Sequence, residues 1–368
     1  MYSLKPILIL VNLSQRKVLR GLKKTRKERR YADSICKVDH MERYISVDSG
    51  KSGTKISVLK STGIVNMEFL TKVDEVNELE SPEEGTYIVE IDGRYFRVGD
   101  NAIHTAPKDT SKKSDFHRIA TWTAVALNCD SGDVVNIAIG CPLSLYESSV
   151  QRTRYKNYML PVNESITVRI KSVNGTQTKS FSFGKRGVFP EGSGLIYFDP
   201  TQYAKKMIAI IDIGGLNMNA GLYDNLKLLH DMIVTRELGG RVLIDELTDA
   251  LNAEYNASVT SKLVENKIFN KDKTQRFIVS SDDPIKSKTE SPAFIHTFIL
   301  NHIKSIYKSV KEAGIDPLNV SLYFIGGTSE LLEEEIKEVF VDPKFVESVF
   351  VNSEGWLRML CRLCQVPF

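Results

Sequence analysis

Residues 208–221 read IAIIDIGGLNMNAG, an apolar run that ends in an aspartate and then turns through two glycines. A second stretch of the same form, YISVDSGKSGTK, covers residues 44–55. A third, LYFIGGTSE at residues 322–330, lacks the aspartate but keeps the apolar run and the glycine pair. An apolar run bounded by glycines is typical of a buried strand that ends in a turn. Two such aspartate turns, one in each half of the chain, predict a duplicated domain that holds one ligand between its halves.

The chemistry of these turns suits a nucleoside triphosphate. Phosphates need backbone N–H donors at close range, and glycine lets the chain approach closely and adopt positive φ. A Mg²⁺ ion that bridges phosphates prefers carboxylates acting mainly through water, and Asp48 and Asp212 are the candidates. Lys55 offers a point charge for the β- or γ-phosphate. One such turn alone is more often an ordinary hairpin, but the two in order, with a third glycine pair downstream, favour nucleotide binding.

Residues 50–52, Gly-Lys-Ser, also resemble the end of a P-loop, G-x-x-x-x-G-K-S/T. The first glycine of that motif would fall at position 45, which is Ile45. A P-loop opens a helix, whereas residues 56–59 (ISVL) predict a strand. Walker-type chemistry is therefore not expected here.

Length and composition fit a globular protein of two domains or two lobes. The chain has 368 residues, of which 42% are hydrophobic and 26% charged, and no apolar run is long enough to span a membrane. Its five cysteines are scattered, which favours a reducing cytoplasm over a disulfide framework. Cys361 and Cys364 have C-x-x-C spacing without a second pair, so we interpret them as two cysteines on a terminal helix.

The net charge of +3 hides an asymmetry. Residues 1–40 hold eleven Lys and Arg against three Asp and Glu, whereas the rest of the chain holds 38 against 43. The basic run at residues 16–30 has three interpretations: a nucleic-acid or membrane-binding arm, a disordered tail, or a segment that precedes a true translation start at Met41. Direct contact with nucleic acid is expected only if this extension is real, and no membrane partner is expected.

From Met41 onward the pattern alternates strand and helix segments. An Asp92-Gly93 turn predicts a hairpin, and residues 64–70, 86–91 and 94–98 are expected to continue the first hairpin as one antiparallel meander. Strands are expected at 44–47, 55–59, 64–70, 86–91, 94–98, 134–139, 168–173, 178–183, 207–211, 220–223, 226–234 and 320–325. Helices are expected at about 115–128, 146–158, 240–253, 258–266, 292–314, 330–339 and 354–364.

The order of these motifs resembles that of the actin-like ATPase superfamily, which includes actin, sugar kinases and heat-shock ATPases. Within it, the sequence is most similar to the bacterial plasmid-segregating actins of the ParM type. The matching segments are a phosphate-1 turn at 48–55, a connecting motif at 139–143, a phosphate-2 turn at 212–221 and an adenosine motif at 324–330. Residues 188–191 (VFPE) are also similar, and the resemblance covers about 42–365.

The resemblance implies an α/β protein with a duplicated ribonuclease-H-like (actin-like ATPase) fold, two lobes around a nucleotide cleft. Residues 1–40 would be an N-terminal extension, residues 41–205 the first lobe with 341–368 returning to it, and residues 206–340 the second lobe. The implied function is an ATP hydrolase that polymerises with ATP into dynamic cytoplasmic filaments for plasmid segregation, with hydrolysis lowering filament stability.

The resemblance also assigns site residues, position by position. Asp48 and Asp212 would hold Mg²⁺ and its waters, with Asp212 also catalytic. Residues around the two phosphate turns would bind the nucleotide phosphates: Ser49, Gly50, Lys51, Gly53, Thr54, Lys55, Gly214, Gly215, Leu216 and Asn217. The adenosine would lie near Gly326, Gly327, Thr328 and Ser329, the ribose near Glu237, Gly239 and Gly240, and the base near Lys262 and Glu265.

Hydrolysis requires a group that orients the attacking water, because phosphoryl transfer is mostly positioning and charge stabilisation. The family places this group on the helix after the connecting motif, which makes Gln151 the first candidate and Glu147 the second. A polar residue on that helix is otherwise part of a solvated face.

The phosphate-2 turn departs from the family pattern. It continues as Leu216-Asn217-Met218-Asn219, where hydroxyl residues and a later aspartate are usual. Asn217 can still donate to a phosphate, but one negative charge is expected to be missing near the metal. The departure leaves both the hydrolysis rate and the choice between ATP and GTP open.

The implied partners are other copies of the chain and a ParR-type adaptor that binds centromeric DNA. Two other functions stay open from the sequence. One is a small-metabolite kinase of the same fold, although no catalytic aspartate for a metabolite is identifiable. The other is a different bacterial cytoskeletal actin.

Overall fold

The computed structural model describes residues 41–78, 80–104, 115–270 and 272–368. The basic run at residues 16–30, and with it the question of an N-terminal arm, lies outside these ranges. The strands in the described ranges form two sheets, one of nine strands and one of five. No helix in the described ranges is both long enough and apolar enough to cross a lipid bilayer.

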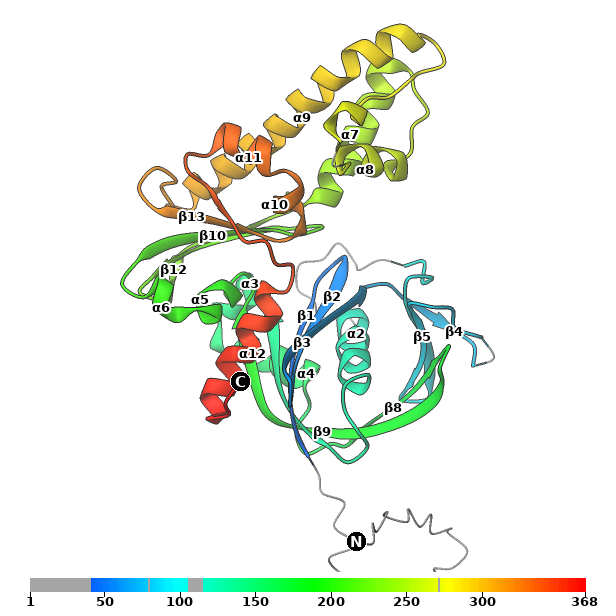
Figure 1. Ribbon diagram of the computed structural model, residues 1–368, viewed down its shortest axis with the longest axis vertical. Coiled ribbons are helices and arrows are strands. Elements are labelled where there is room, and N and C mark those ends of the chain that lie inside the picture. Colours follow the sequence, from blue (N-terminus) through cyan, green and yellow to red (C-terminus); the bar gives the residue numbers. More distant parts are fainter. Residues whose placement is uncertain (1–40, 79, 105–114, 271) are drawn as a thin grey trace, which may run out of the picture. The chain divides into compact units, whose positions relative to one another are not determined.

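The first sheet has the strand order β3-β2-β1-β7-β9-β8-β5-β6-β4. Strand β1, the central strand of the β3-β2-β1-β7-β9 part of this sheet, pairs antiparallel with β2 and parallel with β7. The long strand β9 pairs with β8 through its first half and with β7 through its second half, so it joins both ends of the sheet (Figure 1). The strands are β1 Glu42–Ser49, β2 Gly53–Lys60, β3 Gly63–Leu70, β4 Val73–Val76, β5 Thr86–Ile91, β6 Arg94–Gly99, β7 Val134–Cys141, β8 Ile166–Ser172 and β9 Gly175–Pro190.

This sheet curves around helix α2 (Asp115–Ala126), which the strands enclose in Figure 1. Most of the helix is buried, including Ile119 and Trp122, and it contacts strands from both ends of the sheet. The predicted β5–β6 hairpin is confirmed, with Asp92 and Gly93 at positive φ. The single meander is wrong: β5 pairs with β8 instead of following β3. A helix with apolar residues on all sides must be covered on all sides, and this pairing places strands around it.

The second sheet repeats the arrangement around β10. Strand β10 pairs antiparallel with β11 and parallel with β13, as β1 does with β2 and β7. The predicted duplication is therefore visible as two equivalent central strands. The sheet has the order β12-β11-β10-β13-β14 and comprises β10 Met207–Ile213, β11 Met218–Asp224, β12 Lys227–Arg236, β13 Ser321–Ile325 and β14 Lys344–Phe345.

The helices near the second sheet share an apolar core with it, which includes Ile211, Leu247 and Phe324. Helix α9 begins at Pro284, earlier than the predicted start at 292, because Pro292 lies inside the helix instead of opening it. The Asp283 side chain caps it by accepting a hydrogen bond from the Lys286 N–H. These helices are α7 Gly240–Tyr255, α8 Ser261–Ile268, α9 Pro284–Glu312, α10 Gly327–Leu331 and α11 Glu333–Val339.

The remaining helices belong with the first sheet or with the connection between the sheets. The last helix, α12 (Val351–Cys364), contacts β1, β2 and β7 and crosses α5. Trp356 of this helix is fully buried in a cluster with Ala138 and Phe189. The chain thus returns to the first sheet after completing the second. The other helices are α3 Leu143–Tyr146, α4 Ser149–Met159, α5 Gly194–Phe198 and α6 Pro200–Tyr203.

Candidate functional site

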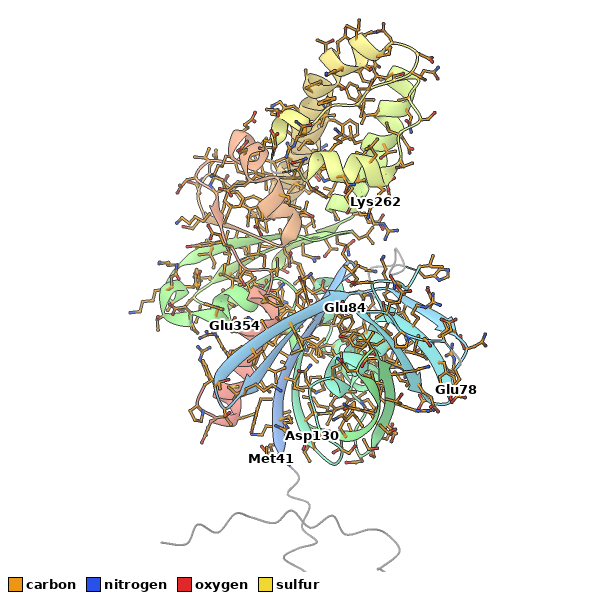
Figure 2. All side chains as sticks on the ribbon, turned by 45° about the vertical axis from the view of Figure 1, so that its right-hand side comes forward. Met41, Glu78, Glu84, Asp130, Lys262 and Glu354 are labelled. Atoms are coloured by element: carbon orange, nitrogen blue, oxygen red, sulfur yellow. The ribbon has the colours of Figure 1, made fainter. Side chains whose placement is uncertain are left out.

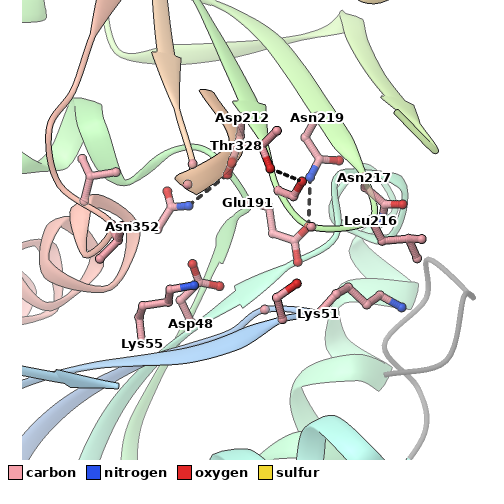
Figure 3. Close-up of a pocket in the computed structure, with 18 of the residues that line it drawn as sticks. Asp48, Lys51, Lys55, Glu191, Asp212, Leu216, Asn217, Asn219, Thr328 and Asn352 are labelled. Carbon is pink, nitrogen blue, oxygen red and sulfur yellow. Dashed lines mark hydrogen bonds between the residues drawn. The ribbon is translucent and has the colours of Figure 1, made fainter. Parts of the chain in front are cut away.

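The two aspartate turns and the third glycine pair line one cavity of about 220 Å³ (Figure 3). Each turn follows a central strand, β1 in the first sheet and β10 in the second, and α12 closes another side. The structure therefore brings together three segments that lie far apart in the sequence. The cavity is lined by Asp48, Gly50, Lys51, Ser52, Lys55, Glu191, Asp212, Gly214, Gly215, Leu216, Asn217, Asn219, Gly326, Gly327, Thr328, Leu331, Val349, Val351 and Asn352.

The Asp212 carboxylate lies in a strongly anionic environment. Its pKa is raised to about 7, first by burial and then by the negative charge of Asp48. A hydrogen bond from Nδ2 of Asn352 to Oδ2 of Asp212, 3.1 Å long, acts in the opposite direction by stabilising the charged form. A carboxylate with so high a pKa gains most from a bound cation, which would relieve the repulsion from Asp48.

The donor set fits Mg²⁺ held largely through water and phosphate. Oδ1 of Asn217 is buried in the cavity wall and accepts no hydrogen bond from the described residues, so an oxygen is available to a hydrated cation. The described part of the chain has no group of three or more His, Cys, Asp or Glu side chains close enough to hold a metal alone. Mg²⁺ dehydrates reluctantly and is commonly held by one or two carboxylates plus substrate phosphates. Asp48 and Asp212 match that requirement.

Glu191 is a cavity residue to which the sequence reasoning gave no role. It follows β9, and its backbone N–H donates to the carbonyl of Cys141 at 3.0 Å. Its carboxylate accepts a hydrogen bond from Nδ2 of Asn219 at 3.3 Å, as Figure 3 shows. The available signal is its place in the string 188–191, directly after the two buried residues that end β9.

Glu191 brings a carboxylate from another segment next to Asn219. Oγ1 of Thr235 donates to Oδ1 of Asn219 at 2.7 Å, which turns the amide NH₂ group toward Glu191. A carboxylate at position 219 would repel Glu191, whereas an amide can donate to it. The expectation of one negative charge too few near the metal stays a prediction.

The phosphate turns are shaped by their own backbone hydrogen bonds. The N–H of Gly50 donates to the carbonyls of Asp48 and Gly53, and the N–H of Gly214 donates to the carbonyl of Asn217. At the third turn Gly326 has φ of +90°, a conformation that side chains disfavour. The hydrogen bonds of Gly50 and Gly214 hold the turns in shape, and the assignment of their N–H groups to phosphate binding stays a prediction.

Gly239 and Gly240, predicted near the ribose, lie behind the phosphate-2 turn and do not line the cavity. Gly239 donates its N–H to the carbonyl of Leu216 at 2.8 Å, and Gly240 donates to that of Gly214 at 3.0 Å. Oγ1 of Thr328 donates to the same Gly214 carbonyl at 3.1 Å. The turn is therefore fixed from two sides, by the start of α7 and by α10.

Several other predicted residues lie outside the lining of the cavity. Lys262 and Glu265 belong to α8, where Figure 2 labels Lys262, and Glu237 precedes α7. Ser329 is buried and its Oγ donates to the carbonyl of Ile325. Their roles stay predictions, as do those of Ser49, Gly53 and Thr54 beside the first turn.

The two candidates for orienting water are also absent from the cavity lining. Gln151 is exposed in the first turn of α4, where its backbone N–H donates to Oγ of Ser148. Glu147 is exposed between α3 and α4. Glu191, by contrast, lines the cavity.

Comparison with known proteins shows which fold this geometry shares. Residues 46–194 match the family model of the actin-like proteins' N-terminal domain. The fold is actin-like. The predicted actin-like fold with its two lobes and the resemblance to ParM-type actins are confirmed, while the residue boundaries of the lobes stay a prediction. No protein with a curated description matches the chain by sequence.

Solved actin-like structures resemble nearly the whole chain. The Alp12 filament structure has 23% identity and a TM-score of 0.63, with 88% of this chain and 99% of that chain covered. An archaeal actin homologue, Ta0583, in complex with ADP has 16% identity and a TM-score of 0.65, with coverages of 87% and 99%. The apo psk41 ParM protein has 10% identity and a TM-score of 0.62, with coverages of 88% and 98%.

Proposed function

We propose that this actin-like protein binds ATP with Mg²⁺ in the cavity, hydrolyses it, and assembles with copies of itself into filaments. The observation that carries the proposal is the placement of Asp48 and Asp212 at the ends of equivalent strands, both facing one cavity. The ADP complex of the archaeal homologue supports nucleotide binding, and the Alp12 filament supports self-association.

The described residues supply the parts that hydrolysis requires. Asp48 and Asp212 would hold hydrated Mg²⁺ against the phosphates, and Lys55 would add a positive charge. Water attacks the γ-phosphorus while the bond to the β–γ bridging oxygen breaks, which releases ADP, phosphate and a proton. Glu191 would orient that water; its presence in the cavity lining, from which Gln151 and Glu147 are absent, supports this choice.

The finer function we infer is plasmid segregation. It rests on the similarity to a ParM protein and carries with it a ParR-type adaptor on centromeric DNA as the partner. ATP is the expected nucleotide, with GTP as the alternative to be compared in the same assays. Filament growth with ATP and release of subunits after hydrolysis would provide the movement.

The first experiment compares Glu191→Gln with Gln151→Ala in a phosphate-release assay. We expect Glu191→Gln to lower kcat by about 100-fold, in the range of a lost general base, while the Kd for Mg·ADP changes little. Gln151→Ala should keep wild-type turnover. If Gln151→Ala instead lowered kcat and Glu191→Gln did not, the water-orienting residue would be Gln151 on α4.

The second experiment measures assembly by pelleting and electron microscopy with ATP, ADP and no nucleotide. Filaments that form with ATP and disassemble as phosphate is released are expected. A wild-type protein that neither hydrolyses ATP nor assembles would refute the proposal. Turnover that depends on an added small metabolite would indicate a kinase instead.

A further inference from the structure

Asn352, in the first turn of α12, bridges two parts of the cavity wall. Its Nδ2 donates to Oδ2 of Asp212 at 3.1 Å, and its Oδ1 accepts the backbone N–H of Gly194 at 3.2 Å. The backbone N–H can only donate, so the amide oxygen must face Gly194 and the NH₂ group must face Asp212. The residue is 7% exposed, which leaves the amide little freedom to turn away.

A close crossing of α5 and α12 lets this short side chain reach both partners. A Cβ added to Gly194 would lie 2.3 Å from Cα of Asn352, and one added to Gly355 would lie 2.0 Å from the carbonyl oxygen of Gly194. Only glycines permit such an approach at these two positions. The crossing therefore fixes where Asn352 stands relative to the start of α5.

The start of α5 is in turn attached to the segment that carries Glu191. Oγ of Ser193 donates to the carbonyl of Pro190 at 2.6 Å, and Nε1 of Trp356 donates to Oγ of Ser193 at 3.0 Å. Both Ser193 and Trp356 are fully buried. Asn352 thus connects Asp212 on β10 with the short turn that presents Glu191.

We propose that Asn352 is a positioning residue for hydrolysis, which holds the Asp212 carboxylate in a fixed place relative to Glu191. This inference rests on the proposed function. Asn352 acts through Asp212. The phosphate turns that would bind the nucleotide are separate segments of the cavity lining. Its loss should therefore affect the rate of the chemical step more than nucleotide affinity.

Two variants separate the two hydrogen bonds of the amide. Asn352→Asp retains an oxygen for the Gly194 N–H but replaces the donor to Asp212 by a second carboxylate oxygen. Asn352→Ala removes both bonds. Ser353→Ala is the matched control, since Ser353 is the next residue of α12, is fully buried, and its Oγ contacts Oγ of Ser57 at 2.9 Å, away from Asp212.

The experiment measures kcat and KM for Mg·ATP, the Kd for Mg·ADP by fluorescent-nucleotide titration, and thermal unfolding. We expect kcat to fall about 10- to 100-fold in both Asn352 variants, with KM and Kd within about threefold of wild type. Ser353→Ala should retain wild-type kcat. If Asn352→Asp does not fold by circular dichroism, Asn352→Ala is judged by the same criteria.

A wild-type kcat in Asn352→Asp would overturn the inference. The hydrogen bond to Gly194 would then be enough for full turnover, without the hydrogen bond to Asp212. A rise in KM as large as the fall in kcat would also overturn it, since Asn352 would then be a binding residue. In both cases an active wild-type protein leaves the proposed function standing. A wild-type protein without nucleotide turnover refutes the inference and the proposed function together.

Discussion

Ser52 and Gly215 bring the two phosphate turns into direct contact. A Cβ added to Gly215 would lie 2.0 Å from Oγ of Ser52 and 3.2 Å from its Cβ. Ser52 belongs to the turn between β1 and β2, and Gly215 to the turn between β10 and β11. Both residues line the cavity. The glycine at 215 is therefore required by a neighbour from the other sheet, since its φ is not in the left-handed region.

Gly215→Ala should force the two turns apart. We expect about a tenfold or greater loss of affinity for Mg·ADP, measured by fluorescent-nucleotide titration, because the steric conflict separates groups that must bind the same phosphates. Ser52→Ala should restore much of that affinity in the double variant, since the nearest conflicting atom is then gone. An absence of coupling between the two substitutions would contradict the contact.

Gly326 is the second position where a side chain conflicts with the site. Its φ is +90°, and a Cβ there would lie 2.5 Å from Oδ1 of Asp212. Gly63 has a similar φ of +112° but no heavy atom within 4 Å of an added Cβ. We expect Gly63→Ala to reduce stability by about 1 kcal/mol through backbone strain alone. Gly326→Ala should reduce stability further and also abolish Mg·ADP binding, as urea unfolding and nucleotide titration would show.

The sequence predicted the turns because their signals are local. An apolar run, an aspartate and a glycine pair stand next to one another at 208–215, and no distant residue is needed to recognise them. Strands β4 and β14 are not predictable from the sequence. They have four and two residues, too few to show the alternation of buried and exposed side chains that marks a strand. The pairing of β5 with β8 is not predictable from local sequence either. It arises because strands from several parts of the chain together cover α2.

The site was predictable only in so far as it is built from those turns. Asn352 lies 140 residues from Asp212 in the sequence, and nothing in its own neighbourhood indicates the hydrogen bond between them. Glu191 and Asn219 likewise exchange a hydrogen bond that only the folded chain reveals. Gln151 is predicted from its place on a helix, but the side chains that line the cavity come from the segments after strands and from α10 and α12.

The raised pKa of Asp212 predicts a pH dependence of stability in the nucleotide-free protein. The folded-state pKa, about 7, exceeds the ordinary value of 3.8, so the folded state holds this proton more tightly. The resulting stabilisation is fully present below about pH 4 and is lost as the pH rises through about 7. Asp212→Asn removes this titration, so the variant should be more stable than wild type at pH 8, by up to about 4 kcal/mol.

Urea unfolding of both proteins at pH 5 and pH 8 measures this effect. The stability difference should widen between the two pH values, and saturating Mg²⁺ with ADP should remove the disadvantage of the wild type. A difference that does not change with pH would contradict the anionic environment described for Asp212.

A buried ion pair outside the lining of the cavity provides a test of stability alone. Arg276 and Glu335 contact each other with side chains 8% and 2% exposed. Burial raises the pKa of Glu335, whereas a backbone hydrogen bond and the Arg276 charge lower it. The lowering effects together are larger, so the pKa of Glu335 lies below its usual range. Glu335→Ala should destabilise the protein by about 3–5 kcal/mol because it leaves a buried charge unpaired.

The double variant Arg276→Met, Glu335→Leu should recover most of that loss, since an apolar pair of similar volume carries no buried charge. Glu333→Ala breaks the exposed pair with Lys337 and should change stability by no more than about 0.5 kcal/mol. Thermal unfolding ranks the three variants, and the Kd for Mg·ADP should be unchanged in the double variant. Equal effects of Glu335→Ala and Glu333→Ala would show that burial of the pair is unimportant.

The crossing of α12 over α5 has a consequence for the order in which the site becomes complete during synthesis. Both phosphate turns and Glu191 emerge from the ribosome well before Asn352, the last cavity residue in the chain. A chain that ends before α12 has both aspartates but lacks the amide that joins Asp212 to the Glu191 turn. Only a chain translated through α12 can therefore form the site with all of its lining residues.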